Sequence, residues 1–296
     1  MFLSRGPARN KKRQTLYSSP PPLPAYKKTP KSVSFMSFNI WGLPWPLTTN
    51  PSRFRSIVDV LTFHSELADV IGFQEVFCNE AKEALKHLTF VYPYHSYHQM
   101  TPMKSDSSLL SSGLLIVSKF PIVDVDFLTY KNCSGFDCFA QKGAQKVTLC
   151  LPNHLYVDVF NTHLESGNNE KSKAIRLNQI DQLLSFMNNT RQVLPFSERL
   201  ILLGDFNAPP FSDEYLAITK NGFFDTECCP VKHPPSFANP EQRIDFIFTS
   251  SSFSPYDHST NRRLSLRRSG VLTDKHSQLS DHFAIVAEFQ FPVPSI

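Results

Sequence analysis

The sequence predicts an α/β sandwich in which two β-sheets face each other and helices cover their outer sides. Two observations carry this prediction. The 296 residues contain many short runs rich in Val, Ile and Phe, and only a few amphipathic stretches lie between them. With 41% hydrophobic and 19% charged residues and no internal repeat, the chain suits one domain with a sizeable core.

Eight segments are predicted to be strands because they combine β-branched and aromatic residues with stretches of period two. They are residues 32–41, 68–76, 113–120, 144–151, 155–164, 199–206, 243–250 and 282–291. Three other segments carry apolar residues at spacings of three and four, as in Ile180, Leu183 and Met187, which predicts surface helices. These helices are expected at residues 53–64, 79–88 and 170–189.

Residues 1–31 differ from the rest of the chain in composition. They are basic and contain the Pro-rich stretch SSPPPLPAYKKTPK, which cannot bury enough apolar surface to fold. We therefore expect a disordered basic arm at 1–31 and a single folded domain at 32–296. The arm either contacts a partner or a membrane surface, serves export from a cell, or is a plain solvated tail.

Charge and targeting signals narrow the class of protein. A net charge of +4 does not by itself indicate a nucleic-acid binder. The chain has no apolar signal-peptide core near its start and no run of about 18 apolar residues that could span a bilayer. We expect a soluble or peripheral protein that resides in the cytoplasm or is exported by a non-classical route.

The six cysteines lack the paired CxxC spacing of a structural zinc site. A disulfide between Cys133 and Cys138 stays open as an alternative. Buried free thiols are the favoured interpretation, because free cysteine is usually found in protein interiors.

Polar side chains gather at the carboxyl ends of the predicted strands, where open α/β sheets tend to place their sites. One Asn or Asp at such a position is usually a turn residue, whereas six strands that share the feature indicate a common site. The residues are Asn39, Glu75, Asn161, His163, Asp205, Asn207, Asp245, Asp281 and His282.

The residue types in this set suit one kind of chemistry. Carboxylate and amide oxygens without nearby thiolates favour Mg²⁺, with Mn²⁺ or Ca²⁺ as alternatives, over zinc. The two histidines supply a general base and a general acid near neutral pH, and asparagine amides can donate to phosphoryl oxygens. Together they predict metal-assisted attack of water on a phosphate ester.

Six short motifs follow one another along the chain. They are FNIWG (38–42), FQEV (73–76), NTHLES (161–166), GDFNAPP (204–210), RIDFIF (243–248) and SDHFAIV (280–286). In this order they resemble the motifs of the endonuclease/exonuclease/phosphatase superfamily, the DNase-like metal-dependent phosphoesterases. The resemblance covers about residues 33–290 and implies a four-layered sandwich of two facing mixed β-sheets flanked by helices.

The resemblance also implies roles for the residues that would handle metal and water. Glu75 would be the principal Mg²⁺ ligand, with Asn39 assisting. His282 would be the general base on water, oriented by Asp245. Asp205 would position that water or a second metal ion.

Four other positions would act on the phosphate and its surroundings. Asn207 and His163 would hold the phosphate and stabilise or protonate the leaving oxygen. Asp281 would contribute to the network of metal and histidine, and Asn161 would belong to the substrate-binding residues.

Three segments are similar to the neutral sphingomyelinase branch of this superfamily, namely FNIWGLPW, SGLLIVSKFPI and DCFAQKG. They favour cleavage of sphingomyelin, or a related choline phospholipid, to ceramide and phosphocholine at a membrane surface. Lys142 would neutralise phosphate charge, or else be an ordinary solvated lysine. Trp41 and Trp45 would contact substrate or membrane, or else pack against the core.

Two alternatives to a sphingomyelinase stay open. The first is a metal-dependent nuclease of the same fold, because Arg263, Ser265 and Arg267 would give a strand at 259–270 a basic face for a nucleic-acid backbone. Such a face would equally suit anionic lipid headgroups or plain solvent. The second alternative is a catalytically silent interaction module, against which the intact set of polar residues argues.

Overall fold

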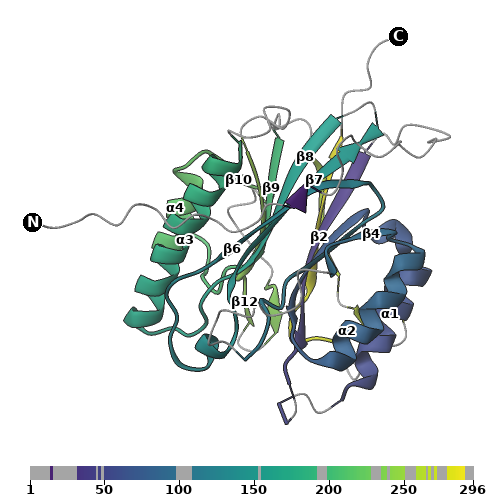
Figure 1. Ribbon diagram of the computed structural model, residues 1–296, viewed down its shortest axis with the longest axis horizontal. Helices are drawn as coiled ribbons and strands as arrows, with labels where there is room; N and C mark the ends of the chain where they lie inside the picture. Colours follow the sequence, from purple (N-terminus) through teal and green to yellow (C-terminus); the bar gives the residue numbers. More distant parts are fainter. Residues whose placement is uncertain are drawn as a thin grey trace, which may run out of the picture.

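Two mixed β-sheets face each other and helices cover both outer sides (Figure 1). The four-layered α/β sandwich predicted from the sequence is therefore confirmed. This computed structural model describes residues 14–15, 32–44, 46–47, 50–97, 109–152, 155–191, 199–227, 235–238, 241–250, 258–264, 266–267, 270–271 and 279–290.

The larger sheet has seven strands and the smaller has six. The larger runs β1 (Gln14–Thr15), β6 (Ile122–Thr129), β7 (Gly143–Leu151), β8 (Leu155–His163), β9 (Arg199–Asp205), β13 (Asp245–Ser250) and β10 (Phe223–Asp225). The smaller runs β14 (His258–Leu264), β17 (Ala284–Gln290), β2 (Ser32–Gly42), β3 (Val70–Val76), β5 (Leu115–Ser118) and β4 (Tyr94–His95). Each sheet contains one parallel pair, β8 with β9 and β2 with β3.

Two short strand pairs lie outside the large sheets: β11 (Phe237–Ala238) with β12 (Glu241–Gln242), and β15 (Leu266–Arg267) with β16 (Gly270–Val271). The helices are α1 (Ser52–Phe63), α2 (Asn79–Leu85), α3 (Glu170–Arg191) and α4 (Asp213–Thr219). Short 3-10 helices lie at Ser65–Leu67, Lys86–Phe90 and Gly135–Phe139.

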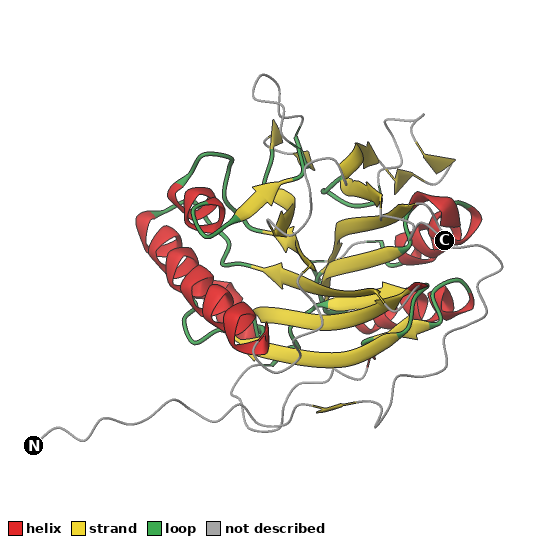
Figure 2. Ribbon diagram, turned by 90° about the horizontal axis from the view of Figure 1, so that it is seen from above, coloured by secondary structure: helices red, strands yellow, loops and turns green. Residues whose placement is uncertain are grey.

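Figure 2 shows the two sheets between their outer helices, and apolar side chains hold these four layers together. Ile57 and Leu61 of α1 pack on the outer face of the smaller sheet, and Ile180 and Leu183 of α3 pack on the outer face of the larger sheet. A third cluster lies between the sheets and includes Phe35 of β2. Both faces of the central strands are thus buried, which explains why their sequences are nearly continuous in apolar residues.

The inner faces of the strands change from apolar to polar along their length. In β9, Ile201 and Leu203 belong to the core between the sheets, and the next residue on the same face is Asp205. In β8 the same alternation leads from Val159 to His163. The polar site is therefore the end of the inter-sheet core rather than a separate structure.

The pairing register brings these polar ends side by side. His163 lies opposite Asp205 in the parallel pair of β8 and β9, and Asp245 of β13 lies opposite Asp205 on its other side. In the smaller sheet Asn39 lies opposite Gln74. Residues that are more than 200 positions apart in the sequence thus reach one edge of the sandwich.

All eight predicted strands and all three predicted helices are present, with ends that differ by a few residues. The second helix is shorter than predicted, since α2 passes into the 3-10 helix Lys86–Phe90. Apart from short strands of two or three residues, β6 and α4 were not predicted from the sequence. In β6 the charged residue Asp124 hid the strand pattern, although it is buried and forms an ion pair with Lys146 at 3.0 Å.

The favoured interpretation of the cysteines is wrong for two of them. Cys133 and Cys138 form a disulfide and both are exposed. Cys78 and Cys150 are buried free thiols, as expected, and Cys228 and Cys229 lie outside the described residues. The disulfide closes the turn that carries the 3-10 helix Gly135–Phe139.

Replacing both Cys133 and Cys138 by serine is expected to lower the free energy of unfolding by about 2 kcal/mol, because closing a loop of about six residues removes roughly that much entropy from the unfolded chain. Urea unfolding of the variant and of wild type measures the difference. Wild type treated with a reductant should unfold at the same urea concentration as the variant. Equal midpoints for oxidised wild type and the variant would contradict the expectation.

Several sequence-based expectations reach beyond the described residues. Within residues 1–31 the structure describes Gln14–Thr15, which pairs with β6, so the disordered arm stays a prediction. The backbone of β14 and β15 is described, but Ser265 and the side chains of Arg263 and Arg267 are not. Among the described residues, no helix has the length and apolar character needed to cross a membrane.

Candidate active site

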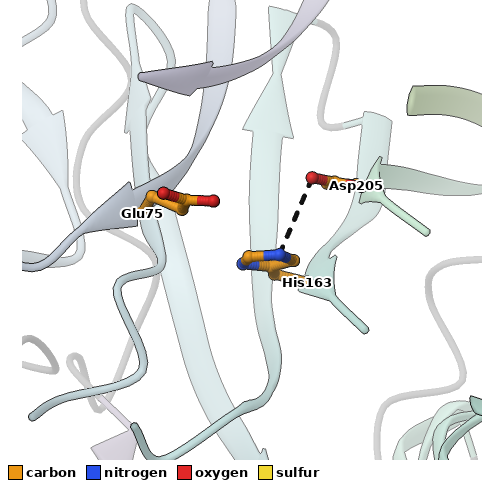
Figure 3. Close-up of side chains that lie close together, drawn as sticks. All are labelled: Glu75, His163 and Asp205. Carbon is orange, nitrogen blue, oxygen red and sulfur yellow. Dashed lines mark ion pairs between the residues drawn. The ribbon is translucent and has the colours of Figure 1, made fainter. Parts of the chain in front are cut away.

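A cleft of about 860 Å³ opens at the polar end of the two sheets. Its lining includes Glu75 from the smaller sheet, and His163 and Asp205 from the larger (Figure 3). One potential ligand atom from each of these three side chains lies within 4.8 Å of the others. The fold therefore brings together residues that the sequence separates by as many as 130 positions.

Glu75 enters the cleft through a left-handed backbone conformation. Strand alternation would place it on the opposite face of β3 from Gln74, which faces the other sheet, but its φ is 59°. This conformation costs a glutamate on the order of 1 kcal/mol or more, and such outliers gather at functional sites. Trp41 and Asn207, which also line the cleft, have φ values of 51° and 49°.

The Glu75 carboxylate is poorly satisfied by protein donors. Its Oε1 accepts a hydrogen bond of 3.0 Å from Asn39, while its Oε2 is buried and has no hydrogen-bond partner among the described residues. Burial raises the pKa of Glu75 to about 7, although the Asn39 hydrogen bond opposes that shift. A divalent cation would satisfy such an oxygen, and the hard oxygen donors of Glu75 and Asp205 suit Mg²⁺ or Mn²⁺.

Asn39 links the two carboxylates rather than offering them an oxygen. Its Nδ2 donates to Glu75 Oε1 and to Asp205 Oδ2, both at 3.0 Å. Its Oδ1 accepts the backbone N–H of Trp41 at 2.9 Å, which fixes the orientation of the amide. In this arrangement the Asn39 amide bridges the two carboxylates, and its part in metal binding stays a prediction.

His282 and Asp245 form a close, buried pair. The His282 Nδ1 atom lies 2.8 Å from Asp245 Oδ2, and Nε2 lies 3.7 Å from Asp205 Oδ2. Burial alone would lower the pKa of His282, but the charges of Asp245, Asp205 and Asp281 outweigh it and raise the pKa to about 10. Asp245 therefore fixes the ring so that Nε2 faces the cleft.

His163 lies in the opposite electrostatic environment. Burial, and then the nearby Lys142 ammonium, lower the pKa of His163 to about 4. The Lys142 Nζ atom lies 3.3 Å from His163 Nε2, donates to the Leu164 carbonyl at 2.6 Å and pairs with Asp137 at 2.8 Å. His163 is thus uncharged at neutral pH, and the positive charge in this corner belongs to Lys142. The alternative of a solvated Lys142 is wrong, because its side chain is buried.

Asn207 and Asp281 also line the cleft, as the sequence suggested. The backbone N–H of Asn207 donates to Asp205 Oδ1 at 2.9 Å, and its Nδ2 donates to the Leu164 carbonyl at 3.1 Å. Burial raises the pKa of Asp281, and Asp205 adds to the shift while His282 opposes it. Both side chains therefore belong to the polar lining of the same cleft.

Asn161 does not reach the cleft. It is fully buried between the sheets, where its Nδ2 donates to the backbone carbonyls of Phe73 and Leu115 and its Oδ1 accepts from Gln74. These bonds use its polar atoms to join the two sheets, so the expected contact with substrate is corrected to a structural one. Trp45 lies outside the described residues.

The mouth of the cleft is apolar, and of its side chains Trp41 was the one singled out from the sequence. Nine large apolar side chains are exposed in the described part of the chain, and five of them line this cleft. The five are Trp41 (38% exposed), Leu47 (62%), Leu109 (74%), Phe136 (89%) and Phe139 (48%). Phe136 and Phe139 belong to the disulfide-closed turn, where two aromatic residues in a short polar segment were the available signal.

The chain is similar in sequence to phospholipases C of other organisms. An inositol phosphosphingolipids phospholipase C of Schizosaccharomyces pombe is 24% identical, over 71% of this chain and 50% of its own length. A phospholipase C of Staphylococcus aureus is 25% identical, over 88% of both chains. The chain thus spans about half the length of the first of these relatives.

Solved structures share the fold. A sphingomyelinase C from Streptomyces griseocarneus matches with a TM-score of 0.66 and 21% identity, over 88% of this chain and 100% of that one. Beta toxin from Staphylococcus aureus, in a mutant form with bound magnesium ions, also has a TM-score of 0.66, with 20% identity and the same coverage. A truncated TDP2 of Caenorhabditis elegans has a TM-score of 0.65, with 20% identity over 88% and 98% of the chains.

The match to a family covers the whole site. Residues 36–282 match the Endonuclease/Exonuclease/phosphatase family, a range that begins in β2 and ends at His282. Because this range makes up most of the chain and holds the entire cluster around the cleft, the chain belongs to the Endonuclease/Exonuclease/phosphatase family.

Proposed function

We propose that this chain is a Mg²⁺-dependent phosphodiesterase of the sphingomyelinase type, which hydrolyses sphingomyelin or a related choline phospholipid to ceramide, or its equivalent, and phosphocholine. One observation carries the proposal: a cluster of carboxylates and histidines lines the same cleft as most of the exposed apolar side chains. A lipid phosphodiester needs both features, since its phosphate is charged and its hydrocarbon chains are apolar.

His282 is the general base in this proposal. Its Nε2 would accept a proton from water while Asp245 holds Nδ1. The water oxygen would form a bond to phosphorus as the bond from phosphorus to the ceramide oxygen breaks, and the leaving oxygen would take up a proton from solvent. When bound at Glu75 and Asp205, a divalent cation would polarise the phosphate and favour the uncharged form of His282.

The part of the cleft that Lys142 lines would hold the charge that develops on the substrate. Lys142 and His163 lie 3.3 Å apart there, and Asn207 is fixed on the same carbonyl as Lys142. These donors would stabilise the phosphoryl oxygens and the leaving oxygen. The ion pair between Lys142 and Asp137 keeps the ammonium at this position before substrate arrives.

The deciding experiment is phosphocholine release from sphingomyelin vesicles, run beside plasmid nicking, with Mg²⁺ or with excess EDTA. We expect phosphocholine release that needs Mg²⁺, and intact plasmid. Plasmid nicking without lipid cleavage would favour the nuclease, whose binding should also fall steeply with added salt. No turnover of either substrate, with the fold intact, would favour the interaction module.

The apolar mouth predicts peripheral contact with a bilayer. Replacing Phe136 and Phe139 by serine is expected to weaken binding to sphingomyelin vesicles roughly tenfold, because each ring would lose part of its apolar burial. Hydrolysis of a water-soluble phosphocholine ester should stay unchanged. The matched control replaces Phe63 and Phe90, which are exposed but lie outside the cleft. Equal losses in both double variants would contradict docking by the mouth.

A further inference from the structure

Arg53 lies in the first turn of α1. It is buried and does not line the cleft. Its Nη1 donates to the carbonyls of Ile40 at 2.5 Å and Leu279 at 2.7 Å, and its Nη2 donates to the carbonyl of Trp41. One guanidinium thus joins the end of β2 to the segment that precedes β17.

The two joined segments carry residues of the site. Ile40 and Trp41 directly follow Asn39, while Leu279 stands three residues before His282. Ser280 completes the link, since its Oγ donates to the Asn39 carbonyl at 2.7 Å and accepts the backbone N–H of His282 at 3.2 Å. Any change in the position of Arg53 therefore reaches both ends of the cluster.

The contact with Trp41 has a specific consequence for the carboxylates. Trp41 is held in a left-handed conformation with a φ of 51°, which is costly for a bulky residue. Its N–H then donates to Asn39 Oδ1, and that bond turns the Asn39 amide so that Nδ2 faces Glu75 and Asp205. The orientation of both carboxylates thus depends on a backbone geometry that Arg53 holds.

Helix stability does not explain this arginine. A cation in the first turn of a helix opposes the helix dipole, and α1 has no acidic residue there to compensate. Burial lowers the pKa of Arg53, and the charges of Asp281 and Glu75 act against that shift. The planar guanidinium of Arg53 packs on Phe54, with its central carbon 4.2 Å from the ring centroid. This contact restricts the guanidinium while its N–H groups bind the three carbonyls.

We infer that Arg53 is a positioning residue for the metal-binding carboxylates, acting through Trp41 and Asn39 on Glu75 and Asp205. The inference rests on the Mg²⁺ binding of the proposed function, but it does not require a lipid substrate. A lysine at this position would keep the charge yet could not present a fork to three carbonyls at once. The orientation of the carboxylates would then be lost while the charge remained.

The test measures how Mg²⁺ raises the unfolding temperature of the full chain, for wild type, Arg53→Lys and the control Arg55→Lys. Arg55 is exposed on the same helix. We expect Arg53→Lys to need at least tenfold more Mg²⁺ for half of its stabilisation, and Arg55→Lys to match wild type. A purely structural role would lower the unfolding temperature equally with and without Mg²⁺, and that result would overturn the inference.

Two further variants make the result of this test unambiguous. In an Asn39→Ala background, Arg53→Lys should cause little additional loss of Mg²⁺ response, because its route to the carboxylates is already broken; a full additive loss would contradict that route. If Arg53→Lys does not fold, Arg53→Gln replaces it under the same criterion. Wild type that responds to Mg²⁺ but releases no phosphocholine would refute the lipid substrate alone, whereas wild type without any Mg²⁺ response would overturn the role of Arg53 as well.

Discussion

Replacing His282 by alanine is expected to lower kcat for phosphocholine release roughly 10³-fold, which is the usual size of a general-base contribution. The ring is the basic group best placed for water, since Asp245 binds Nδ1 at 2.8 Å and leaves Nε2 facing Asp205 and the cleft. Steady-state rates on sphingomyelin vesicles in saturating Mg²⁺ measure the effect. The rise in unfolding temperature with Mg²⁺ should persist, because Glu75 remains.

The matched control is His87→Ala, since His87 is exposed in the 3-10 helix Lys86–Phe90 and does not line the cleft. It should retain the wild-type rate. Replacing Asp245 by asparagine should give a loss that approaches that of the His282 variant, because the ring would lose the partner that orients it. A His282 variant with more than a tenth of the wild-type rate would refute the assignment of the base.

Replacing Glu75 by glutamine is expected to have opposite effects on activity and stability. Activity should fall roughly 10³-fold, since the variant loses the carboxylate that would bind the cation. Without metal, however, the variant should be more stable than wild type above pH 7, by about 3 kcal/mol. The reason is that an ionised carboxylate with an unsatisfied oxygen is buried in wild type, and glutamine is uncharged.

The sign of the pH dependence follows from the raised pKa of Glu75. Folding raises this pKa from 4.5 to about 7, so the folded state holds the proton more tightly than the unfolded state. The contribution to stability is therefore complete below pH 4.5 and is lost as the pH rises through 7. Glutamine does not titrate, and the variant should lack this loss.

Urea unfolding at pH 5 and pH 8, with EDTA and with excess Mg²⁺, measures both effects. Wild type should regain stability at pH 8 when Mg²⁺ is added, and the Glu75 variant should not. Glu83→Gln is the control, because Glu83 is exposed and pairs with Lys86 at the surface. A Glu75 variant that is less stable than wild type at pH 8 in EDTA would contradict the expectation.

The layered fold was predictable because the sequence shows both the strand alternation and the helical spacing of apolar residues. Strands such as β9 place Ile201 and Leu203 on one face, and α3 repeats Ile180 and Leu183 at helical spacing. The same alternation predicts that Asp205 follows the core on its inner face. Motif order then predicted which strand ends meet.

Backbone geometry set the limit of that prediction. Glu75 reaches the cleft against strand alternation, through a left-handed φ that the sequence FQEV does not reveal. Asn161 and His163 share a face of β8, yet Asn161 stops between the sheets because its amide binds backbone carbonyls of the smaller sheet. Arg53 was not singled out, since three carbonyl contacts across distant segments leave no local pattern.

The disulfide-closed turn was also beyond the sequence reading. Spacing alone allowed a bridge between Cys133 and Cys138, but the usual burial of free thiols favoured the other interpretation. Exposure of both cysteines depends on how the turn leaves the end of β6, which is a property of the assembled sheet. The part that Phe136 and Phe139 of this turn take in the apolar mouth was not predicted for the same reason.

The alternation of side chains along β9, which leads from the inter-sheet core to Asp205, has a consequence for insertions and deletions. One extra residue within β9 would preserve the backbone pairing but turn Asp205 toward α3 and an apolar residue toward the cleft. Two extra residues would restore the face but displace the carboxylate by about 6.6 Å along the strand. Insertions and deletions that keep the site residues in place are therefore confined to the connections between strands. The regular spacing of residues along each strand sets the positions of the site residues.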